Sequence, residues 1–512
     1  MTPPSRQIPP TPFAEGGKRG ISRIETVPIA GLMEQSGVGF GTSGARGLAH
    51  AMTDRVCYAY TAAFLDYLTE RGEVAAGDRV ALAGDLRSTT PRIMRACSLA
   101  IGDCGFVPVN CGFVPTPAVT CWAMGEGLAS IMVTGSHIPD DRNGIKFNRP
   151  AGEILKEDEA GIRAQAPRVP DVFDTRGALR TPADLPPVSP QARAAYIARY
   201  LDVLPAGSLS GRKIAVYEHS SVAREILVEV LAGLGADVLR LGRSECFIPV
   251  DTEAVRPEDE ALARGWAREH GFFAICSADG DGDRPLVGDE SGEFLRGDVA
   301  GILTAVWLKA DTVVTPVSSN TAVERCGWFE RVERTRIGSP YVIAGMMAAP
   351  GGRVVGYEAN GGFLTSSEIE RDGRRLAALP TRDAVIVVLG LLLLAGERGV
   401  PVSGLAGLLP PRFTASDRLK DFPTALSGAR IGGLREGGVA AVTAAFGTDF
   451  GPVASLDSTD GLRITFVSGE IVHLRPSGNA PELRCYNEAD SPGRAAAMNR
   501  RCLELLANWR NS

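Results

Sequence analysis

The chain has 512 residues, enough for about three or four domains, and this length excludes a single small module. Hydrophobic residues make up 44% of the chain and charged residues 22%, a balance that excludes wholesale disorder and is typical of a globular protein with sizeable cores. The net charge of -6 provides no global positive field, so we expect no nucleic-acid partner and no attraction to an anionic membrane.

The start of the chain and its most apolar segment bear on where the protein resides. Residues 1–35 are rich in Pro, Ser and charge and lack the apolar core of a secretory signal, so we expect a flexible tail there. The ten cysteines include no CxxC pair, which favours a reducing compartment. The longest apolar run, 385–395, spans only 11 residues, against about 20 needed to cross a bilayer. It predicts a buried core helix in a cytoplasmic protein.

From residue 79 to 360 short β-rich runs alternate with helical stretches. This alternation predicts parallel sheets covered by helices, with too many βα units for one sheet. The helices are expected to begin at Pro91 and Val222 and to lie near 299–309 and 341–349. The expected strands are 79–84, 106–110, 129–135, 212–217, 236–241, 271–276, 311–317 and 352–357.

The pattern changes after residue 410. Pro-rich, charged stretches at 166–192 and 408–424 are typical of connections between domains. Beyond them, runs at 461–467, 470–477 and 482–488 favour antiparallel strands, closed by a helix that Ser491 and Pro492 begin. We therefore predict α/β domains at 36–195, 196–305 and 306–410, and an α+β domain at 411–512.

The string DGDGDRP, 279–285, directly follows the expected strand 271–276. Carboxylates at alternate positions with glycine between them can face one point, which suits a hard divalent cation, and we predict a metal site at Asp279, Asp281 and Asp283. An EF-hand is excluded, because Arg284 stands where that loop needs glycine and a strand leads into the string. A solvated acidic turn remains the alternative.

A second string, VTGSHIPDDRNGIKF at 133–147, places Ser136 in a glycine-flanked turn after an expected strand. His137 is adjacent to it, and Lys146 follows ten residues later. A serine after a strand is often only a cap. Together with a metal site and nearby cations, however, a serine hydroxyl could carry a phosphoryl group.

The string GFGTSGARG, 39–47, matches G-x-G-x-x-G but lacks the preceding strand and following helix of a dinucleotide site. We expect instead a glycine-dense turn that presents backbone amides and the guanidinium of Arg46 to an anion. No P-loop motif occurs in the sequence, which excludes a nucleotide engine of that type.

Two further glycine-containing turns carry groups suited to sugar and phosphate recognition. In GYEANGG, 356–362, Glu358 and Asn360 could bond neighbouring hydroxyls, although an ordinary turn is equally compatible. In RPSGNAPELRCYNE, 475–488, guanidinium, hydroxyl and amide donors surround a turn and suit a phosphate dianion, with a plain hairpin as the alternative. The donors in this last string are Arg475, Ser477, Gly478, Asn479 and Arg484.

In this order, the five motifs resemble those of the α-D-phosphohexomutase superfamily, and among its members the chain is most similar to bacterial phosphomannomutases. The resemblance runs from about residue 38 to 490. It implies three α/β domains with mixed sheets and a C-terminal antiparallel α+β domain around a central cleft. It also implies reversible conversion of mannose 1-phosphate to mannose 6-phosphate, through a phosphoserine enzyme and a hexose 1,6-bisphosphate intermediate.

The resemblance also implies a role for each motif. Ser136 carries the phosphate and shares Mg²⁺ with the three aspartates, while Arg46, Lys146, His137 and Arg284 serve acid–base or charge-stabilising work. By the same resemblance, Glu358 and Asn360 bind sugar hydroxyls, the string 475–488 binds the distal phosphate, and Arg336 adds a further contact. Some bacterial members have histidine where Gly362 lies, so a histidine base there is excluded. Ile138 and Asn479 also depart from the common pattern.

These departures affect the substrate more than the reaction. Mannose phosphate, leading to GDP-mannose, is the first expectation, with glucose phosphate second and glucosamine phosphate third. We expect Mg²⁺ as cofactor, hexose 1,6-bisphosphate as activator, and a monomer or homodimer. Two other classes stay open: a metal-dependent phosphatase with Asp279 as its nucleophile, and a calcium-stabilised carbohydrate-binding protein, which would leave Ser136 and Lys146 without a role.

Overall fold

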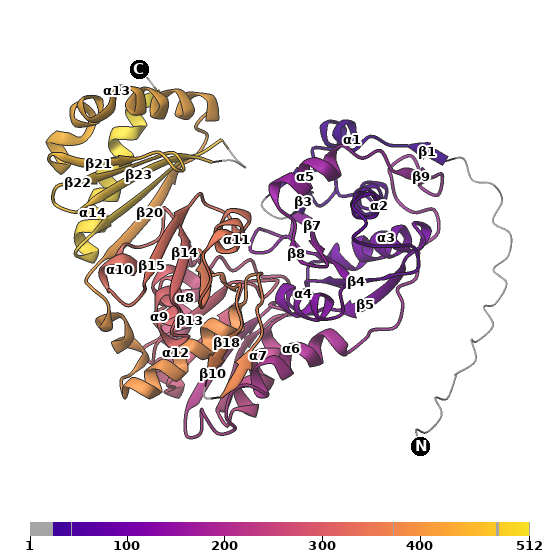
Figure 1. Ribbon diagram of the computed structural model, residues 1–512, viewed down its shortest axis with the longest axis horizontal. Coiled ribbons are helices and arrows are strands. Elements are labelled where there is room, and N and C mark those ends of the chain that lie inside the picture. Colours follow the sequence, from indigo (N-terminus) through magenta and orange to yellow (C-terminus); the bar gives the residue numbers. More distant parts are fainter. Residues whose placement is uncertain (1–23, 42–43, 372, 478–480, 511–512) are drawn as a thin grey trace.

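The computed structural model describes residues 24–41, 44–371, 373–477 and 481–510, which form four main sheets (Figure 1). The N-terminal α/β unit lies at one end of the molecule and the C-terminal antiparallel unit at the other, with the second and third sheets between them (Figure 1). Mixed sheets and a final antiparallel sheet confirm the predicted fold class.

The first sheet is mixed and has the strand order β2-β3-β7-β6-β4-β5, with β8 beside β7. Strands β5, β4 and β6 are parallel, and β7 runs antiparallel to β6. Its helices pack on both faces, α2 and α3 in one core cluster and α4 in another. The elements are β2 Gly39–Phe40, β3 Gly44–Leu48, α2 Asp54–Glu70, β4 Arg79–Gly84, α3 Thr90–Asp103, β5 Val107–Gly112, α4 Thr116–Gly125, β6 Ala129–Val133, β7 Arg142–Arg149, β8 Gly152–Glu153 and α5 Lys156–Arg163.

Part of the predicted flexible tail is ordered. Strand β1 (Ile24–Thr26) pairs antiparallel with β9 (Arg168–Pro170), and helix α1 (Ile29–Ser36) buries Ile29 and Leu32. The expectation of a tail up to residue 35 is therefore wrong from residue 24 onward. A strand of three exposed residues has no alternation to detect in the sequence, and its pairing depends on β9, which lies far along the chain.

The second and third sheets repeat the plan of the first. Their orders are β11-β10-β12-β13 and β15-β14-β16-β17, each with three parallel strands and a fourth that runs antiparallel. In all three sheets the third and fourth strands form a hairpin, and the motifs of Ser136, Asp279 and Glu358 lie in these hairpin turns. The elements are α6 Gln191–Leu201, β10 Lys213–His219, α7 Arg224–Gly233, β11 Asp237–Arg243, α8 Pro257–His270, β12 Ala274–Ala278, β13 Pro285–Gly288, α9 Gly297–Trp307, β14 Thr312–Pro316, α10 Ala322–Arg325, β15 Arg331–Thr335, α11 Ser339–Ala348, β16 Val354–Tyr357 and β17 Phe363–Thr365.

The apolar run 385–395 lies in helix α12 (Ala384–Arg398), whose residues there are almost all buried, as predicted. The hairpin of β18 (Ile369–Arg371) and β19 (Arg374–Leu376) precedes α12 in the chain, and a 3₁₀ helix, η1 (Val402–Leu408), follows it. Within the described ranges, no single helix is long and apolar enough to cross a membrane. Helices α12 and η1 taken together have the length and composition of a membrane span, but the chain bends by 82° between them.

Asp383 caps helix α12 and links it to α6. Its carboxylate accepts hydrogen bonds from the amides of Val385 and Ile386 and from the hydroxyls of Tyr196 and Tyr200. We expect Asp383→Ala to lower the free energy of unfolding by about 2 kcal/mol, the upper range for an N-cap, because two buried hydroxyls also lose their acceptor. Urea denaturation would measure it, and a change below about 0.5 kcal/mol would contradict the assignment.

The C-terminal sheet is antiparallel throughout, with the order β20-β24-β23-β22-β21, as predicted. Its own apolar core runs from Phe422 to Leu506, whereas one continuous core from Ala81 to Leu409 joins the other three sheets. The elements are β20 Phe413–Leu419, α13 Thr424–Phe450, β21 Val453–Asp457, β22 Leu462–Phe466, β23 Ile471–Pro476, β24 Leu483–Ala489, α14 Pro492–Ala507 and a 3₁₀ helix η2 Asn508–Arg510.

Polar groups join this unit to the third sheet. Buried Glu488 on β24 accepts hydrogen bonds from the amide and hydroxyl of Thr321 and, at 2.6 Å, from Nε of Arg412. The side chain of Asn320 donates to the carbonyl of Arg412 at 2.8 Å. Strand β20 falls within the stretch 408–424 that we predicted to be a connection, so the connection itself is shorter.

Candidate active site

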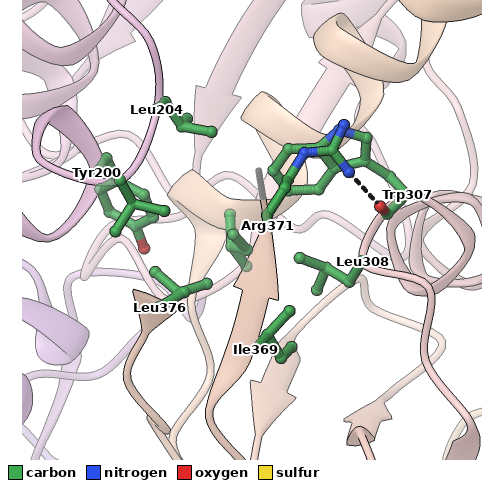
Figure 2. A pocket seen from close by; sticks show the side chains of 9 residues that line it. Tyr200, Leu204, Trp307, Leu308, Ile369, Arg371 and Leu376 are labelled. Carbon is green, nitrogen blue, oxygen red and sulfur yellow. Dashed lines mark hydrogen bonds between the residues drawn. The ribbon is translucent and has the colours of Figure 1, made fainter. Parts of the chain in front are cut away.

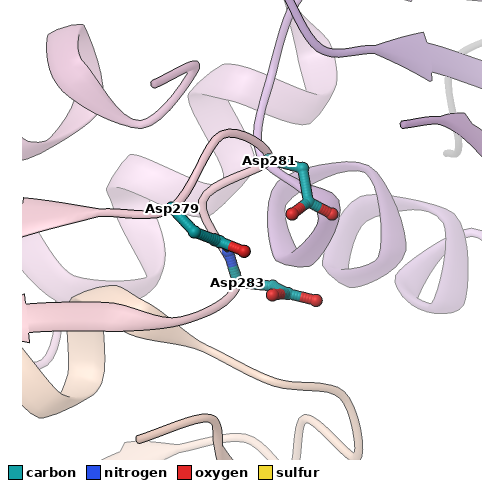
Figure 3. Close-up of side chains that lie close together, drawn as sticks. All are labelled: Asp279, Asp281 and Asp283. Atoms are coloured by element: carbon teal, nitrogen blue, oxygen red, sulfur yellow. Dashed lines mark hydrogen bonds between the residues drawn. The ribbon is translucent and has the colours of Figure 1, made fainter. Parts of the chain in front are cut away.

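The three aspartates of DGDGDRP lie on the turn between β12 and β13, and their carboxylates point to the same side of it (Figure 3). All three side chains are fully buried. Gly280 lies so close to the serine loop that a Cβ there would be 2.9 Å from the carbonyl oxygen of Ser136. This close approach of two backbones is what the glycine permits, and it places the acidic turn directly against the serine.

The acidic turn fits a divalent cation. One carboxylate oxygen from each aspartate can be chosen so that all three lie within 4.8 Å of one another. Oδ1 of Asp281 and Oδ1 of Asp283 are buried and have no hydrogen-bond partner among the described residues. Burial and the two neighbouring carboxylates raise the pKa of Asp279 well above its ordinary value. Unpaired buried oxygens of this kind are the donors that a hard cation such as Mg²⁺ prefers.

Ser136 lies in the turn that follows β6, with its hydroxyl on the acidic turn. Its Oγ donates to Oδ2 of Asp279 at 2.7 Å, and its amide donates to Oγ1 of Thr134 at 2.7 Å. The side chain is 1% exposed, and φ is +56°, a left-handed conformation that is uncommon for a residue with a Cβ. The loop therefore holds the hydroxyl in a fixed, strained position.

Arg87, which the sequence motifs missed, holds that loop. Its guanidinium donates to the carbonyls of Ser136, Ile138, Pro139 and Arg142, at distances between 2.5 and 3.2 Å. The same side chain pairs with buried Asp85 at 3.0 Å. A guanidinium with this many carbonyl partners fixes the backbone around the serine.

Lys146, on β7, links the first sheet, whose turn after β6 carries Ser136 (the serine sheet), to the acidic turn of residues 279–285. Its Nζ donates to Oδ2 of Asp281 and to Oδ2 of Asp283, both at 2.6 Å. Burial lowers the pKa of Lys146, but the two carboxylates outweigh it and the pKa lies above its ordinary value. Burial raises the pKa of Asp283, but the positive charges of Arg382 and Lys146 outweigh burial, so this pKa lies well below its ordinary value. Lys146 is therefore a fixed positive charge in this site.

Arg284 and Arg46 add positive charge to the site, and His137 lies between Arg284 and the serine. Nη1 of Arg284 lies 2.8 Å from Nδ1 of His137, which is 3.3 Å from the Ser136 hydroxyl. Burial and the charge of Arg284 lower the pKa of His137 to about 3, so it stays neutral. Burial and Arg284 also lower the pKa of Arg46, to about 10.

Arg46 lies on a strand rather than in the glycine-dense turn that we expected. It belongs to β3, where it pairs with Gly39 of β2 and Gly144 of β7. Gly44 on the same strand is in such close contact with β7 that a Cβ there would lie 2.0 Å from the carbonyl oxygen of Ile145. The glycines of this motif therefore bring strands together, and Thr42 and Ser43 lie outside the described residues.

The sugar-binding candidates lie on the turn after β16. Glu358 is buried, and its carboxylate accepts from Arg382 at 3.2 Å. The carbonyl of Asn360 accepts from the hydroxyl of Thr252 at 2.7 Å, and its side chain accepts from the amide of Gly362 at 3.0 Å. Asn360 thus shapes its own loop, while Glu358 connects through Arg382 to Asp283.

The C-terminal candidates lie at neighbouring strand ends. Arg475 on β23 and Arg484 on β24 are register partners, and each has a carboxylate neighbour, Asp460 at 2.9 Å and Glu482 at 3.7 Å. Ser477 is buried on the same turn, while Gly478 and Asn479 lie outside the described residues. Arg336 is exposed with its guanidinium over the ring of Tyr341, and among the described residues no hydrogen bond or ion pair joins it to the acidic turn.

A separate apolar cavity lies between α6, α9 and the hairpin of β18 and β19 (Figure 2). Arg371 crosses it, donating to the carbonyl of Trp307 at 2.6 Å with its guanidinium over the indole (Figure 2). The other lining residues are Tyr200, Val203, Leu204, Leu308, Ile369, Leu376 and Ile386. Since most of them belong to the continuous core, this cavity is a packing feature and does not contact the acidic turn.

Comparison with known families identifies three parts of the chain. Residues 37–171 match the model of phosphoglucomutase/phosphomannomutase alpha/beta/alpha domain I, residues 296–413 match domain III, and residues 432–505 match the C-terminal domain. The domain III match begins ahead of the boundary that we predicted at 306.

Curated relatives extend the likeness over most of the chain. A phosphomannomutase of Sinorhizobium fredii is 45% identical over 471 residues, which are 91% of this chain and 98% of that relative. A phosphomannomutase of Salmonella muenchen is 42% identical over 90% of this chain and 94% of that relative. A phosphoglucosamine mutase of Symbiobacterium thermophilum is 29% identical over 77% of this chain and 84% of that relative.

Solved structures share the fold. A phosphoglucomutase/phosphomannomutase family protein of Burkholderia thailandensis superposes with a TM-score of 0.70 at 19% identity, covering 92% of this chain and 97% of that one. A phosphoglucomutase of Paramecium, in an open form, superposes with a TM-score of 0.66 at 16% identity, covering 94% of this chain and 96% of that one.

Proposed function

The chain belongs to the phosphoglucomutase/phosphomannomutase family and is an isomerase of the phosphohexomutase type, and from this premise we propose that it interconverts mannose 1-phosphate and mannose 6-phosphate. One observation carries the proposal. The hydroxyl of Ser136 lies 2.7 Å from a carboxylate oxygen of the buried acidic turn, in a strained loop that Arg87 holds in place. A serine in this setting is positioned for phosphoryl transfer rather than for capping.

The reaction then has two transfers. Phosphorylated Ser136 gives its phosphoryl group to the free 6-hydroxyl of mannose 1-phosphate. The bond from phosphorus to the serine oxygen breaks, a bond from phosphorus to O6 forms, and the hydroxyl proton passes in balance to the released serine oxygen, which leaves mannose 1,6-bisphosphate. After the bisphosphate reorients in the site, the phosphoryl group on O1 is transferred to the hydroxyl of Ser136, the serine proton passes in balance to O1, and mannose 6-phosphate leaves. A hexose 1,6-bisphosphate present in solution activates the enzyme by phosphorylating Ser136.

The residues of the site divide this work. Asp279, Asp281 and Asp283 would hold Mg²⁺, which when bound offsets negative charge at the transferring phosphoryl group. Lys146 and Arg46 supply fixed positive charge from the serine sheet, and Arg284 supplies it from the acidic turn. Glu358 binds sugar hydroxyls, and Arg475, Ser477 and Arg484 bind the phosphate that does not react, which orients the reacting end.

We expect mannose phosphate to be the preferred substrate, since two relatives above 40% identity are named phosphomannomutases. Glucose phosphate and glucosamine phosphate follow, the latter because a phosphoglucosamine mutase matches at 29% identity. Phosphorus NMR with Mg²⁺, a trace of hexose 1,6-bisphosphate and each sugar 1-phosphate in turn tests the proposal. Conversion to the 6-phosphate supports it, while release of inorganic phosphate instead would favour the phosphatase.

Removal of the metal gives a further test. Enzyme dialysed against a chelator should lose about 10³-fold in turnover, the rate factor for several kcal/mol of charge stabilisation, and added Mg²⁺ should restore it. The initial rate of conversion after dialysis, with and without added Mg²⁺, measures this. If the dialysed enzyme, shown to be metal-free by elemental analysis, keeps its full rate, the acidic turn does not serve as proposed.

A further inference from the structure

Arg382 is a buried cation that neither the sequence motifs nor the proposed reaction uses. It precedes helix α12, and its residue is only 2% exposed. Its Nε and Nη2 lie 3.0 and 2.9 Å from Oδ2 of Asp283. Its Nη1 donates to Oε2 of Glu358 at 3.2 Å and to Oγ of Ser339 at 3.3 Å. One guanidinium therefore spans the acidic turn and the turn of Glu358.

The geometry suits arginine in particular. A planar fork can bond one carboxylate on its Nε edge and another through its far nitrogen, and a lysine ammonium cannot hold both at these angles. Asp283 and Glu358 come from different sheets, and among the described residues no backbone hydrogen bond joins their two turns. Within the described residues, Arg382 is the side chain that bonds both carboxylates.

A further carboxylate holds the segment that carries Arg382. Glu153, on β8 of the first sheet, accepts from the hydroxyl of Thr381 at 2.6 Å and from that of Ser339 at 3.0 Å. Burial lowers the pKa of Arg382, but the negative charges of Asp283, Glu153 and Glu358 outweigh the cost of burying the guanidinium. The pKa of Arg382 therefore lies well above its ordinary value. The arginine is therefore anchored to all three α/β units.

Gly362 makes room for this arginine. A Cβ at position 362 would lie 2.5 Å from Cδ and 2.8 Å from Cγ of Arg382, closer than real carbon atoms approach. The stem of Arg382 thus fills the space that any side chain at 362 would need. The presence of the arginine and the absence of a side chain at 362 depend on each other.

We propose that Arg382 is a positioning residue that sets Glu358 at a fixed place relative to Asp283, and that Gly362 has no side chain because the arginine occupies its space. The inference rests on the proposed function, in which Glu358 binds the sugar and Asp283 belongs to the metal turn. Through this link, the sugar hydroxyls are held in register with the phosphoryl group on Ser136.

A double-mutant cycle between Arg382 and Glu358 tests the link. Arg382→Met should lower kcat for the sugar 1-phosphate by about 100-fold, the cost of a displacement near 1 Å at the reacting atoms. In a Glu358→Gln background, Arg382→Met should lower kcat by less than about fivefold, because the carboxylate that Arg382 positions is already changed. Arg382→Lys should recover part of kcat. Additive losses in the cycle would overturn the proposal and indicate a merely structural role.

Binding without chemistry gives a second readout. In protein freed of metal by chelation, calorimetric titration with mannose 1-phosphate should show about tenfold weaker binding for Arg382→Met than for wild type. The matched control is Arg353→Met, which breaks a guanidinium–carboxylate pair with Asp311 next to β16 and should leave kcat and KM unchanged. Equal affinity of wild type and Arg382→Met would contradict the proposal.

Variants of Gly362 test whether Arg382 occupies the space that a side chain at position 362 would need. Gly362→Ala should lower kcat at least tenfold in the wild-type background but change it less than twofold in an Arg382→Ala background, where the space is free. If Gly362→Ala alone does not fold, recovery of folding in the double variant supports the inference. An equal loss in both backgrounds would overturn it. Failure of the wild-type enzyme to convert any hexose phosphate would contradict the proposed function, and that result is seen before any variant is made.

Discussion

Ser136→Ala is expected to lower conversion of mannose 1-phosphate by at least about 10⁴-fold, the scale that follows loss of a covalent nucleophile. The expected size follows from the geometry, since the Ser136 hydroxyl faces the acidic turn at 2.7 Å and the alanine variant has no oxygen to carry the phosphoryl group. Phosphorus NMR measures the rate. Mass spectrometry of the intact protein, after incubation with hexose 1,6-bisphosphate, should show a phosphate on wild type and none on the variant.

A matched control lies on β6, the strand that precedes the turn of Ser136. Ser130 is buried on β6, where its hydroxyl accepts from Asn148 at 3.1 Å, and Ser130→Ala should keep turnover within about threefold of wild type. Ser136→Ala also separates the enzyme classes, whereas Asp279→Asn removes a carboxylate that either enzyme needs. In the mutase, the phosphoryl group is carried by Ser136, so Ser136→Ala is inactive. In a phosphatase with Asp279 as its nucleophile, Ser136→Ala would stay almost fully active while Asp279→Asn would be inactive.

Arg87→Met is expected to lower the free energy of unfolding by about 3–5 kcal/mol, the cost of leaving a buried charge without its partner. Asp85 loses its guanidinium, and the carbonyls of Ser136, Ile138 and Pro139 lose their donor. Turnover should fall as well, since the left-handed conformation of Ser136 depends on those bonds. Chemical denaturation, with the midpoint and slope recorded for both proteins, measures the effect.

The double variant Arg87→Met/Asp85→Asn separates the two parts of that loss. It should regain part of the stability, because no buried carboxylate is left unpaired, but its turnover should stay as low as that of Arg87→Met, because the serine loop is still unsupported. An unchanged denaturation midpoint for Arg87→Met would show that the loop holds its conformation without the arginine.

Much of the candidate site could be located from the sequence because its main residues follow strands. Ser136, Asp279 and Glu358 each stand directly after an apolar run, and the carboxyl ends of parallel strands are where α/β proteins place ligands. The acidic spacing of 279–283 also predicts convergence without knowledge of the fold. What the sequence could not show was that three sheets repeat one strand order, because the repeat lies in topology and not in residue types.

The missed residues share another property. Thr116 bonds Asp281 across 165 positions of sequence, and Thr381 bonds Glu153 across 228. Arg382 and Arg87 bond residues from distant parts of the chain in the same way. The residues that flank them in the sequence do not indicate that either arginine is buried. A short motif can indicate a loop that carries chemistry, but the side chains that hold such loops together are defined only by tertiary packing.

The separation of apolar cores bears on how the chain is made. One core unites the first three sheets from Ala81 to Leu409, and the last sheet has its own from Phe422 to Leu506, joined to the third sheet through polar groups such as Glu488. During synthesis the ribosome releases the chain from its N-terminus, and domains fold as units. The larger core can therefore close before translation of the C-terminal unit is complete, and that unit can fold afterwards against a finished surface.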